Sequence, residues 1–208
     1  MEVKMERLKE MSMHSTTTLM TSEDGKNTYC FSKEFEELEG KRGILILLYP
    51  TRTVENYHVE DSTTIHIMKH MKKVGLKAYT IVNLFSHVVK KRLSTRGLEI
   101  DEENLQFIKK EIFEKFDPKK EMVIIAWGNS HDTSQVVNNS KKKILEMWME
   151  LYPNEKLYHF TVSGGEREGD GVHPLYLGIR HDNSEWKISP YPVKKCLKQL
   201  QQKKEKEV

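Results

Sequence analysis

Cysteine is scarce in this sequence, and its scarcity excludes several kinds of site. Cys30 and Cys196 lie far apart and have no ligand-like spacing, so they predict neither a disulfide framework nor a cysteine-based zinc site. At most they could form one bridge, and two buried, reduced thiols are the simpler expectation.

Long apolar runs are also missing. The longest one covers residues 44–49, far short of the ~20 residues that a membrane-spanning helix needs. The N-terminus, M-E-V-K-M-E-R-L-K-E, has no apolar core of the kind found in signal peptides. The sequence therefore predicts a soluble, cytoplasmic protein with no membrane partner.

Excess charge is small, at +3 in 208 residues, and by itself does not indicate nucleic-acid binding. Basic residues do cluster at 90–92, at 141–143 and in the C-terminal segment. Such clusters can meet phosphates, although solvated helix faces and a frayed tail are the commoner explanation. The length predicts one domain over residues 1–208, with an N-terminal extension at 1–15 and a basic C-terminal helix or tail at 194–208.

Strand-like and helical patterns alternate along the chain. Residues 16–35 resemble a hairpin, because Asp24-Gly25 suits a tight turn. Four apolar, partly β-branched runs follow, at residues 44–48, 79–82, 122–126 and 157–162. This order predicts an α/β fold with a parallel sheet covered by helices on both faces.

Three helices are expected between these strands. The first is capped by Asp61 and carries an apolar stripe of Ile65, Met68, Met71 and Val74. The second begins at Asp101, with a stripe of Leu105, Ile108, Ile112 and Phe116. The third spans about residues 134–151.

Ligands of such sheets bind beyond the carboxyl ends of the strands, so the segments that follow the strands are the candidate site. These segments are Tyr49-Pro50-Thr51, Asn83-Leu84-Phe85, Trp127-Gly128-Asn129 and His173-Pro174-Leu175-Tyr176. We expect all four to converge on one rim.

These segments also carry a resemblance. The ordered set L-Y-P-T, E-D-S-T, V-N-L-F, A-W-G and H-P-L-Y resembles a family of uncharacterised bacterial and phage proteins whose usual pattern is L-N-P-S, D-D-P-T, V-N-L-F, A-W-G and H-P-L-Y. That family in turn resembles the uracil-DNA glycosylase superfamily. The similarity spans roughly residues 29–177, and five motifs in order are more specific than any one of them.

The resemblance implies a fold and a set of roles. The fold would be a three-layer sandwich with a central four-stranded, mainly parallel sheet, uracil-DNA-glycosylase-like, plus the N-terminal hairpin. Asn83 would read the edge of a pyrimidine, and His173 would stabilise charge on the carbonyl oxygen of the leaving base. Phe85 or Trp127 would stack on that base. Asn83 has a competing explanation, which is a hydrogen bond to the backbone at the strand end.

Tyr49 departs from the glycosylase pattern, because it stands where those enzymes keep a water-orienting Asn or Asp. A phenol is a poor substitute for that group. Asp61 is the nearest carboxylate in sequence and could activate the water instead, although a capping role alone explains it too. Asp61 and His173 are thus the predicted catalytic residues. The predicted ligand-binding residues are Tyr49, Pro50, Thr51, Asn83, Phe85, Trp127, His173 and Tyr176.

Neither a metal nor a cofactor is expected. His66 and His70 have i, i+4 spacing, but they fall opposite the expected apolar stripe and lack a third ligand. The glycine-rich segment 163–171 lacks the Lys of a phosphate-binding loop and is expected to form a flap. Two functions stay open: hydrolysis of an N-glycosidic bond in DNA or a nucleotide, and binding of a nucleobase-like ligand, a nucleic acid or a protein without catalysis.

Overall fold

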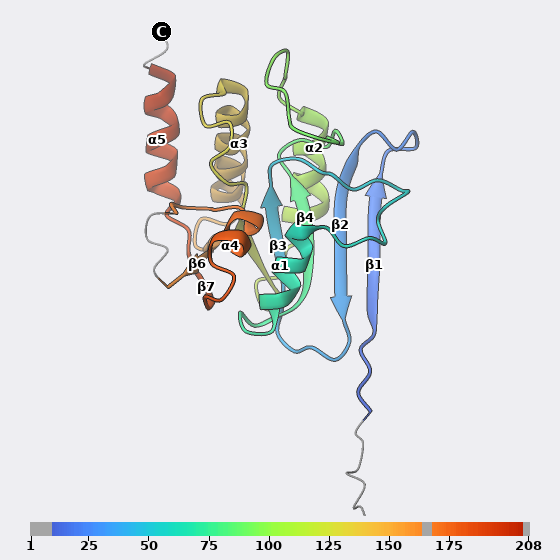
Figure 1. Cartoon of the computed structure of the whole chain (residues 1–208). Coiled ribbons are helices and arrows are strands. Elements are labelled where there is room, and N and C mark those ends of the chain that lie inside the picture. The colour runs from blue at the N-terminus through green and yellow to red at the C-terminus, as the bar shows by residue number, and fades with distance from the viewer. Residues whose placement is uncertain (1–9, 164–167, 206–208) are drawn as a thin grey trace, which may run out of the picture.

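The computed structural model describes residues 10–163 and 168–205 of the chain and has an α/β architecture (Figure 1). Seven strands form one sheet in the order β1-β2-β4-β3-β5-β6-β7. The strands are β1 (Ser15–Thr21), β2 (Thr28–Phe35), β3 (Lys41–Leu47), β4 (Leu76–Asn83), β5 (Glu121–Ile125), β6 (Tyr158–Val162) and β7 (Trp186–Pro190).

The four predicted strands are present as β3 to β6, and they pair in parallel. The prediction of a four-stranded sheet is nevertheless wrong, because the sheet is mixed and larger. The N-terminal hairpin belongs to it, since β2 pairs antiparallel with β4. At the other edge β7 pairs antiparallel with β6. Strand β7 was not predicted, because Trp186 is its one buried residue and the alternation is weak.

The helices lie on both faces of the sheet, as the sequence predicted. They are α1 (Ser62–Met71), α2 (Glu102–Phe107), α3 (Gln135–Leu151), α4 (Pro174–Arg180) and α5 (Val193–Glu205), with a π-helical segment, η1 (Ile108–Phe113), directly after α2. One core lies between the sheet and α2, η1, α3 and α5. The second core lies under α1 and α4, which are in front of the sheet in Figure 1.

Strand β3 explains the unbroken apolar run that the sequence shows. Ile44 and Ile46 point into one core, whereas Leu45 and Leu47 point into the other. A central parallel strand buried on both faces needs apolar side chains at every position, because successive residues alternate between the faces. Strand β3 therefore runs through the interior of the protein, between the two cores.

The first helix begins as predicted but buries a different face. Asp61 caps it, and the Asp61 Oδ1 accepts a hydrogen bond of 2.8 Å from the backbone N–H of Thr64. The predicted stripe is wrong at Ile65, which is exposed, while His70 is buried and stacks on Trp186 with ring centroids 4.3 Å apart. This indole belongs to the unpredicted strand β7. Packing against it makes α1 bury His70 in place of Ile65.

The second helix departs from α geometry halfway along. Asp101 caps it as expected, but the chain continues from Ile108 in π-helical form. A π turn closes one residue later than an α turn, so Phe113 rather than Ile112 becomes fully buried.

The basic clusters lie in different surroundings. Lys141, on α3, is buried, and its Nζ donates to the carbonyl of Gly128 (3.0 Å) and to Asp132 Oδ1 (2.9 Å). Lys141 is thus no solvated helix residue. The cluster at 90–92 lies in a loop, and the C-terminal basic segment forms α5.

Several single-site expectations can be compared with the structure. Cys30 and Cys196 are buried and free, and burial raises the pKa of Cys30 to about 11. Across residues 10–163 and 168–205, no helix has the length and apolarity to cross a membrane, and no group of three potential metal ligands occurs. Residues 164–167 of the expected flap lie outside the described residues, as do residues 1–9 of the expected N-terminal extension and residues 206–208 of the expected C-terminal segment.

The core between the sheet and α3 gives a stability prediction. Trp148 is 1% exposed and packs edge-on against Phe113 and Phe116. Trp148→Ala should lower the free energy of unfolding by about 3–5 kcal/mol, because it leaves a cavity among aromatic rings. Met149→Ala is the matched control, since Met149 is 39% exposed and its truncation should have little effect. Urea denaturation measures both, and equal losses would contradict the described packing.

Candidate functional site

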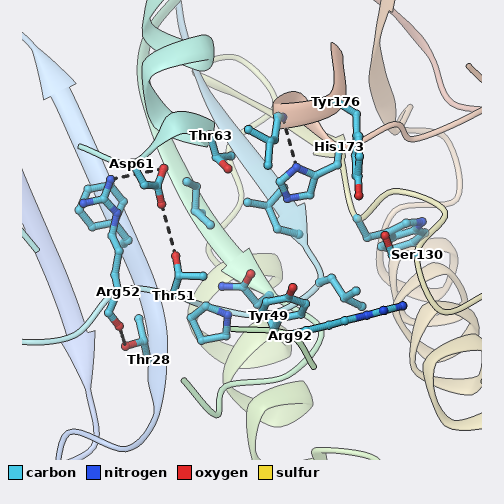
Figure 2. Close-up of a pocket in the computed structure, with 18 of the residues that line it drawn as sticks. Thr28, Tyr49, Thr51, Arg52, Asp61, Thr63, Arg92, Ser130, His173 and Tyr176 are labelled. Carbon is cyan, nitrogen blue, oxygen red and sulfur yellow. Dashed lines mark hydrogen bonds and ion pairs between the residues drawn. The ribbon is translucent and has the colours of Figure 1, made fainter. Parts of the chain in front are cut away.

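A pocket of about 570 Å³ opens at the carboxyl edge of the sheet (Figure 2). Strands β4 and β5 lie on either side of β3. The connection from β3 to β4 therefore runs to one side of β3, and the connection from β4 to β5 crosses to the other side. This reversal of strand order is where ligands of open α/β sheets bind. The pocket volume lies in the range of about 300–1,000 Å³ that small-molecule sites occupy.

The structure brings together nearly all residues predicted from the sequence. The predicted residues that line the pocket are Tyr49, Pro50, Thr51, Asp61, Asn83, Trp127, His173 and Tyr176. They come from the segments after β3, β4, β5 and β6, as the parallel arrangement requires.

Phe85 is the exception among the predicted residues. Its side chain is 2% exposed and lies in the core on the α2 and α3 side of the sheet, outside the pocket lining. Its backbone N–H donates to the carbonyl of Leu48 at 3.2 Å. The strand-end segment therefore turns Phe85 inward, and Trp127 is left as the predicted stacking residue that lines the pocket.

Several residues of the lining were not predicted from the sequence. Thr28 and Phe31 reach the pocket from β2, and Ser130 and His131 reach it from the loop before α3. The β2 residues could not be foreseen, since they depend on the pairing of the hairpin with β4. Arg52 was also missed, although it directly follows the Tyr-Pro-Thr turn.

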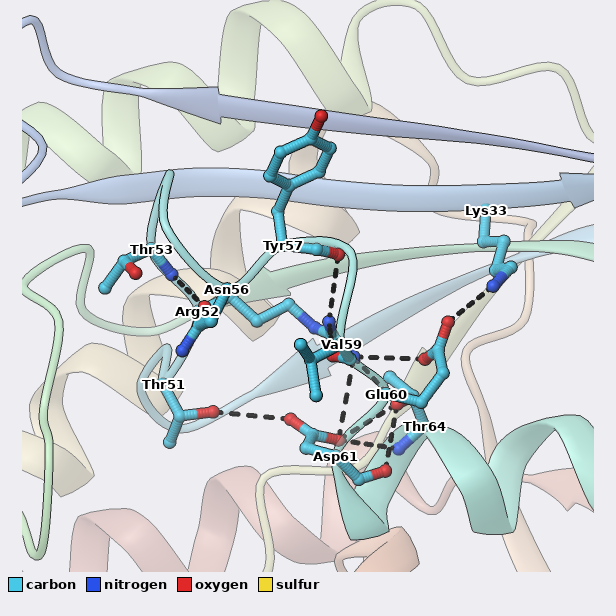
Figure 3. A network of polar contacts seen from close by, with 10 residues as sticks. All are labelled: Lys33, Thr51, Arg52, Thr53, Asn56, Tyr57, Val59, Glu60, Asp61 and Thr64. Carbon is cyan, nitrogen blue, oxygen red and sulfur yellow. Dashed lines mark hydrogen bonds and ion pairs between the residues drawn. The ribbon is translucent and has the colours of Figure 1, made fainter.

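Arg52 organises the loop that forms one wall (Figure 3). Its Nη1 donates to the carbonyls of Val59 (2.5 Å) and Tyr57 (3.2 Å). Its Nη2 donates to Thr64 Oγ1 (2.8 Å) and to Glu60 Oε2 (3.1 Å). The guanidinium is buried, so these bonds offset the cost of removing its charge from water.

The same guanidinium joins this loop to the sheet. It lies 4.0 Å from the centroid of the Phe31 ring, a cation–π contact. The Thr28 hydroxyl donates to the carbonyl of Arg52 at 2.8 Å. Loop 51–61 is therefore held at both its start and its end, and Asp61 has a fixed position.

Asp61 combines a capping role with a place in the pocket lining. Its Oδ1 accepts from the backbone N–H and the hydroxyl of Thr64. Its Oδ2 accepts from the hydroxyl of Thr51 at 3.3 Å, and Figure 2 shows this pair on the pocket wall. The cap fixes the carboxylate so that one edge can face a ligand.

His173 is held as a neutral hydrogen-bond donor. Its Nδ1 accepts from the backbone N–H of Leu175 at 3.2 Å, which places the ring proton on Nε2. Burial lowers the pKa of His173 to about 4, and the negative charge of Asp61 opposes this only in part. At neutral pH the ring therefore carries no charge, and its Nε2–H is available to donate to a ligand.

Gly128 explains how the His-Pro segment comes so close to the end of β5. A Cβ built on Gly128 would lie 3.1 Å from the Cβ of His173, and the φ of Gly128 is +70°. Its N–H donates to the carbonyl of Gly171 at 2.9 Å. The A-W-G motif thus positions His173 through a residue without a side chain.

Asn83 offers an acceptor for which the described residues provide no donor. The residue is 3% exposed, and its Oδ1 is buried without a hydrogen bond. The backbone carbonyl of Asn83 does have a partner, the side-chain amide of Asn104, at 2.7 Å. A buried, unpaired amide oxygen costs about 1–3 kcal/mol, so a ligand that donates to Asn83 would relieve this cost.

Comparison with family models places the chain among known sequences. The model of the family described as "Protein of unknown function (DUF1643)" matches residues 29–175. The chain belongs to the DUF1643 family. No curated protein and no solved structure matches it. The matched residues of this DUF1643 protein include every pocket residue discussed above except Thr28 and Tyr176.

The close approach at Gly128 can be tested in this DUF1643 protein. Gly128→Ala should destabilise the fold and displace His173, because the new methyl group meets the Cβ of His173 and the φ is positive. Gly97→Ala is the matched control, since Gly97 has the same φ of +70° with open space around it. It should cost about 1 kcal/mol and leave the His173 NMR signals unchanged. Identical effects of the two variants would contradict the contact.

The charge state of His173 gives a second prediction. In an NMR titration its ring should show the Nε2–H form at pH 7 and protonate only near pH 4. His14 is the internal reference, because its hydrogen bond to Glu37 raises its pKa above 6.5. The unfolded chain binds more protons than the folded one between the two pKa values of His173. This residue should therefore reduce stability as pH falls from 6.5 to 4. A His173 midpoint near 6.5 would overturn the assignment.

Proposed function

We propose that this protein recognises a nucleobase in the pocket at the carboxyl edge of β3 to β6. The observation that carries the proposal is the pairing of Asn83 with His173 in one lining. Asn83 presents a buried acceptor, and His173 presents a neutral donor. The edge of a nucleobase carries donors and acceptors side by side, so it can satisfy both residues at once.

Two further features support a base as the ligand. Trp127 and Tyr49 provide aromatic surface in the lining, on which a planar ring can stack. The resemblance to uracil-DNA glycosylases assigns base recognition to the same two polar residues. We extend the proposal to the fold, with β3 to β6 as the glycosylase-like parallel core.

The reaction that this site supports best is hydrolysis of an N-glycosidic bond. Negative charge grows on the base as the bond breaks, and the Nε2–H of His173 can stabilise it on a carbonyl oxygen. Positive charge grows on the sugar, where the fixed carboxylate of Asp61 can stabilise it and orient a water. Figure 2 shows Asp61 and His173 on different walls of the pocket, as attack on one side of the sugar and departure of the base require.

Tyr49 favours a second candidate, which is binding of the same ligand without cleavage. It occupies the position of the water-orienting residue, and it lines the pocket. Both oxygens of Asp61 already accept hydrogen bonds from the protein, which leaves fewer lone pairs for a water. The two candidates share the base pocket and differ only in the fate of the bond.

Base release from a panel of oligonucleotides and nucleotides with canonical and modified bases separates the candidates. If the protein is a hydrolase, Asp61→Asn should lower the rate by about 100-fold or more, because a neutral amide cannot stabilise the positive charge that grows on the sugar. The same variant should melt within a few degrees of the wild type, since Asn caps helices as well as Asp does. A large loss of stability would show that the Asp61 effect is structural.

Binding measurements on the same panel test the pocket itself. Asn83→Ala should weaken ligand binding about tenfold or more through loss of a buried hydrogen bond. Asn139→Ala is the control, because Asn139 lies on α3 outside the pocket lining. Saturable binding without base release, with release appearing in Tyr49→Asn, would establish the second candidate. Equal binding by the Asn83→Ala and wild-type proteins would contradict base recognition.

A further inference from the structure

One wall of the pocket carries two cations that have no ion-pair partner among the described residues. Lys91 and Arg92 line the pocket from the loop after β4 and are exposed. Neither forms a hydrogen bond or an ion pair with any residue in the described ranges. The other long cation in the lining, Arg52, is buried and bonded on both Nη atoms.

The described surroundings of Arg92 hold no free carboxylate that would offset its charge. His131 lines the same pocket, and its pKa is lowered by burial first and then by the charges of Arg92 and Lys141. Asp132, the adjacent carboxylate, forms an ion pair of 2.9 Å with Lys141. Figure 2 shows Arg92 extending toward Ser130, with Asp61 on the other side of the pocket. This wall therefore attracts an anion.

We propose that Lys91 and Arg92, with Ser130 and His131, form a phosphate subsite, so that the ligand is a free nucleoside monophosphate. This inference rests on base recognition by Asn83 and His173, which the proposed function supplies. The base would occupy the part of the pocket near the buried Asn83 oxygen, and the phosphate would lie against the cations. Arg and Lys both bind phosphate through charge-assisted hydrogen bonds.

Two observations favour a mononucleotide over a base flipped out of DNA. First, about 570 Å³ is far more space than a single planar base fills, and it leaves room for the sugar and the phosphate. Second, the cations are not continued by a basic track across the pocket. In the opposite segment, residues 51–65, the one arginine is buried and paired with Glu60, and the carboxylate of Asp61 lines the pocket. A polymer backbone would therefore meet a carboxylate on that side rather than a further cation for its next phosphates.

Calorimetric titration of matched ligands tests the subsite. The probes are the five common 2′-deoxynucleosides, including deoxyuridine, their 5′-monophosphates, inorganic phosphate, and a single-stranded oligonucleotide of each base. The best monophosphate should bind about tenfold or more tightly than its nucleoside, and Arg92→Ala or Lys91→Ala should remove that advantage. Lys90→Ala is the matched control, because Lys90 is a neighbouring cation that lines a different pocket.

Each of the other outcomes would overturn one part of the proposal. Equal binding of nucleoside and monophosphate, or equal losses in Lys90→Ala and Arg92→Ala, would overturn the phosphate subsite and leave base recognition intact. Tighter binding of the oligonucleotide than of the monophosphate would overturn the free-nucleotide ligand. Binding of every phosphate probe with the same affinity, unaffected by Asn83→Ala, would keep the subsite and reject base recognition. Absence of binding by all probes would reject both.

Discussion

The buried guanidinium of Arg52 is the interaction on which this site depends. A buried charge must find enough hydrogen-bond acceptors, or its desolvation cost destabilises the fold. Arg52 finds them in two carbonyls, a hydroxyl and a carboxylate, and its flat face lies on Phe31 of β2. Meeting these demands joins the hairpin, the loop after β3 and the start of α1 into one unit.

The residues that line the pocket differ in how far the protein satisfies their polar groups. Arg52 is bonded, and the carboxylate of Asp61 accepts from Thr51 and Thr64. In contrast, the oxygen of Asn83 and the cations of Lys91 and Arg92 have no described partner. Preorganised groups position a ligand, and unsatisfied ones gain most when it binds. The bonded residues therefore give the pocket its rigidity, and the residues without a described partner provide the binding energy for a ligand.

Local signals in the sequence carried the prediction where the decisive interaction is local. Helix starts at Asp61 and Asp101 followed from capping chemistry, and each side chain accepts the expected backbone hydrogen bond. The four parallel strands followed from apolar runs. The convergence of their carboxyl ends predicts most of the pocket lining.

Prediction failed where a distant segment decides the outcome. Ile65 fits a helical stripe, but β7 supplies Trp186, and the helix buries His70 against it. The sequence predicts Lys141 to be a surface residue, but its ammonium group is buried and donates to the carbonyl of Gly128 and to Asp132. The contribution of β2 to the pocket depends on a strand pairing that leaves no periodic trace. These residues are set by tertiary contacts, which one sequence does not display.

The order of the strands has a consequence for how the molecule opens. Every strand that supplies the pocket lies inside the sheet, and the two edge positions belong to β1 and β7, which contribute nothing to the described lining. Local opening begins at elements with few neighbours, so fraying consumes the edges first. This applies most to β1, whose side chains are exposed or half-buried, whereas β7 is anchored by the buried Trp186. Amide hydrogens of β1 would therefore exchange with solvent while the pocket keeps its shape.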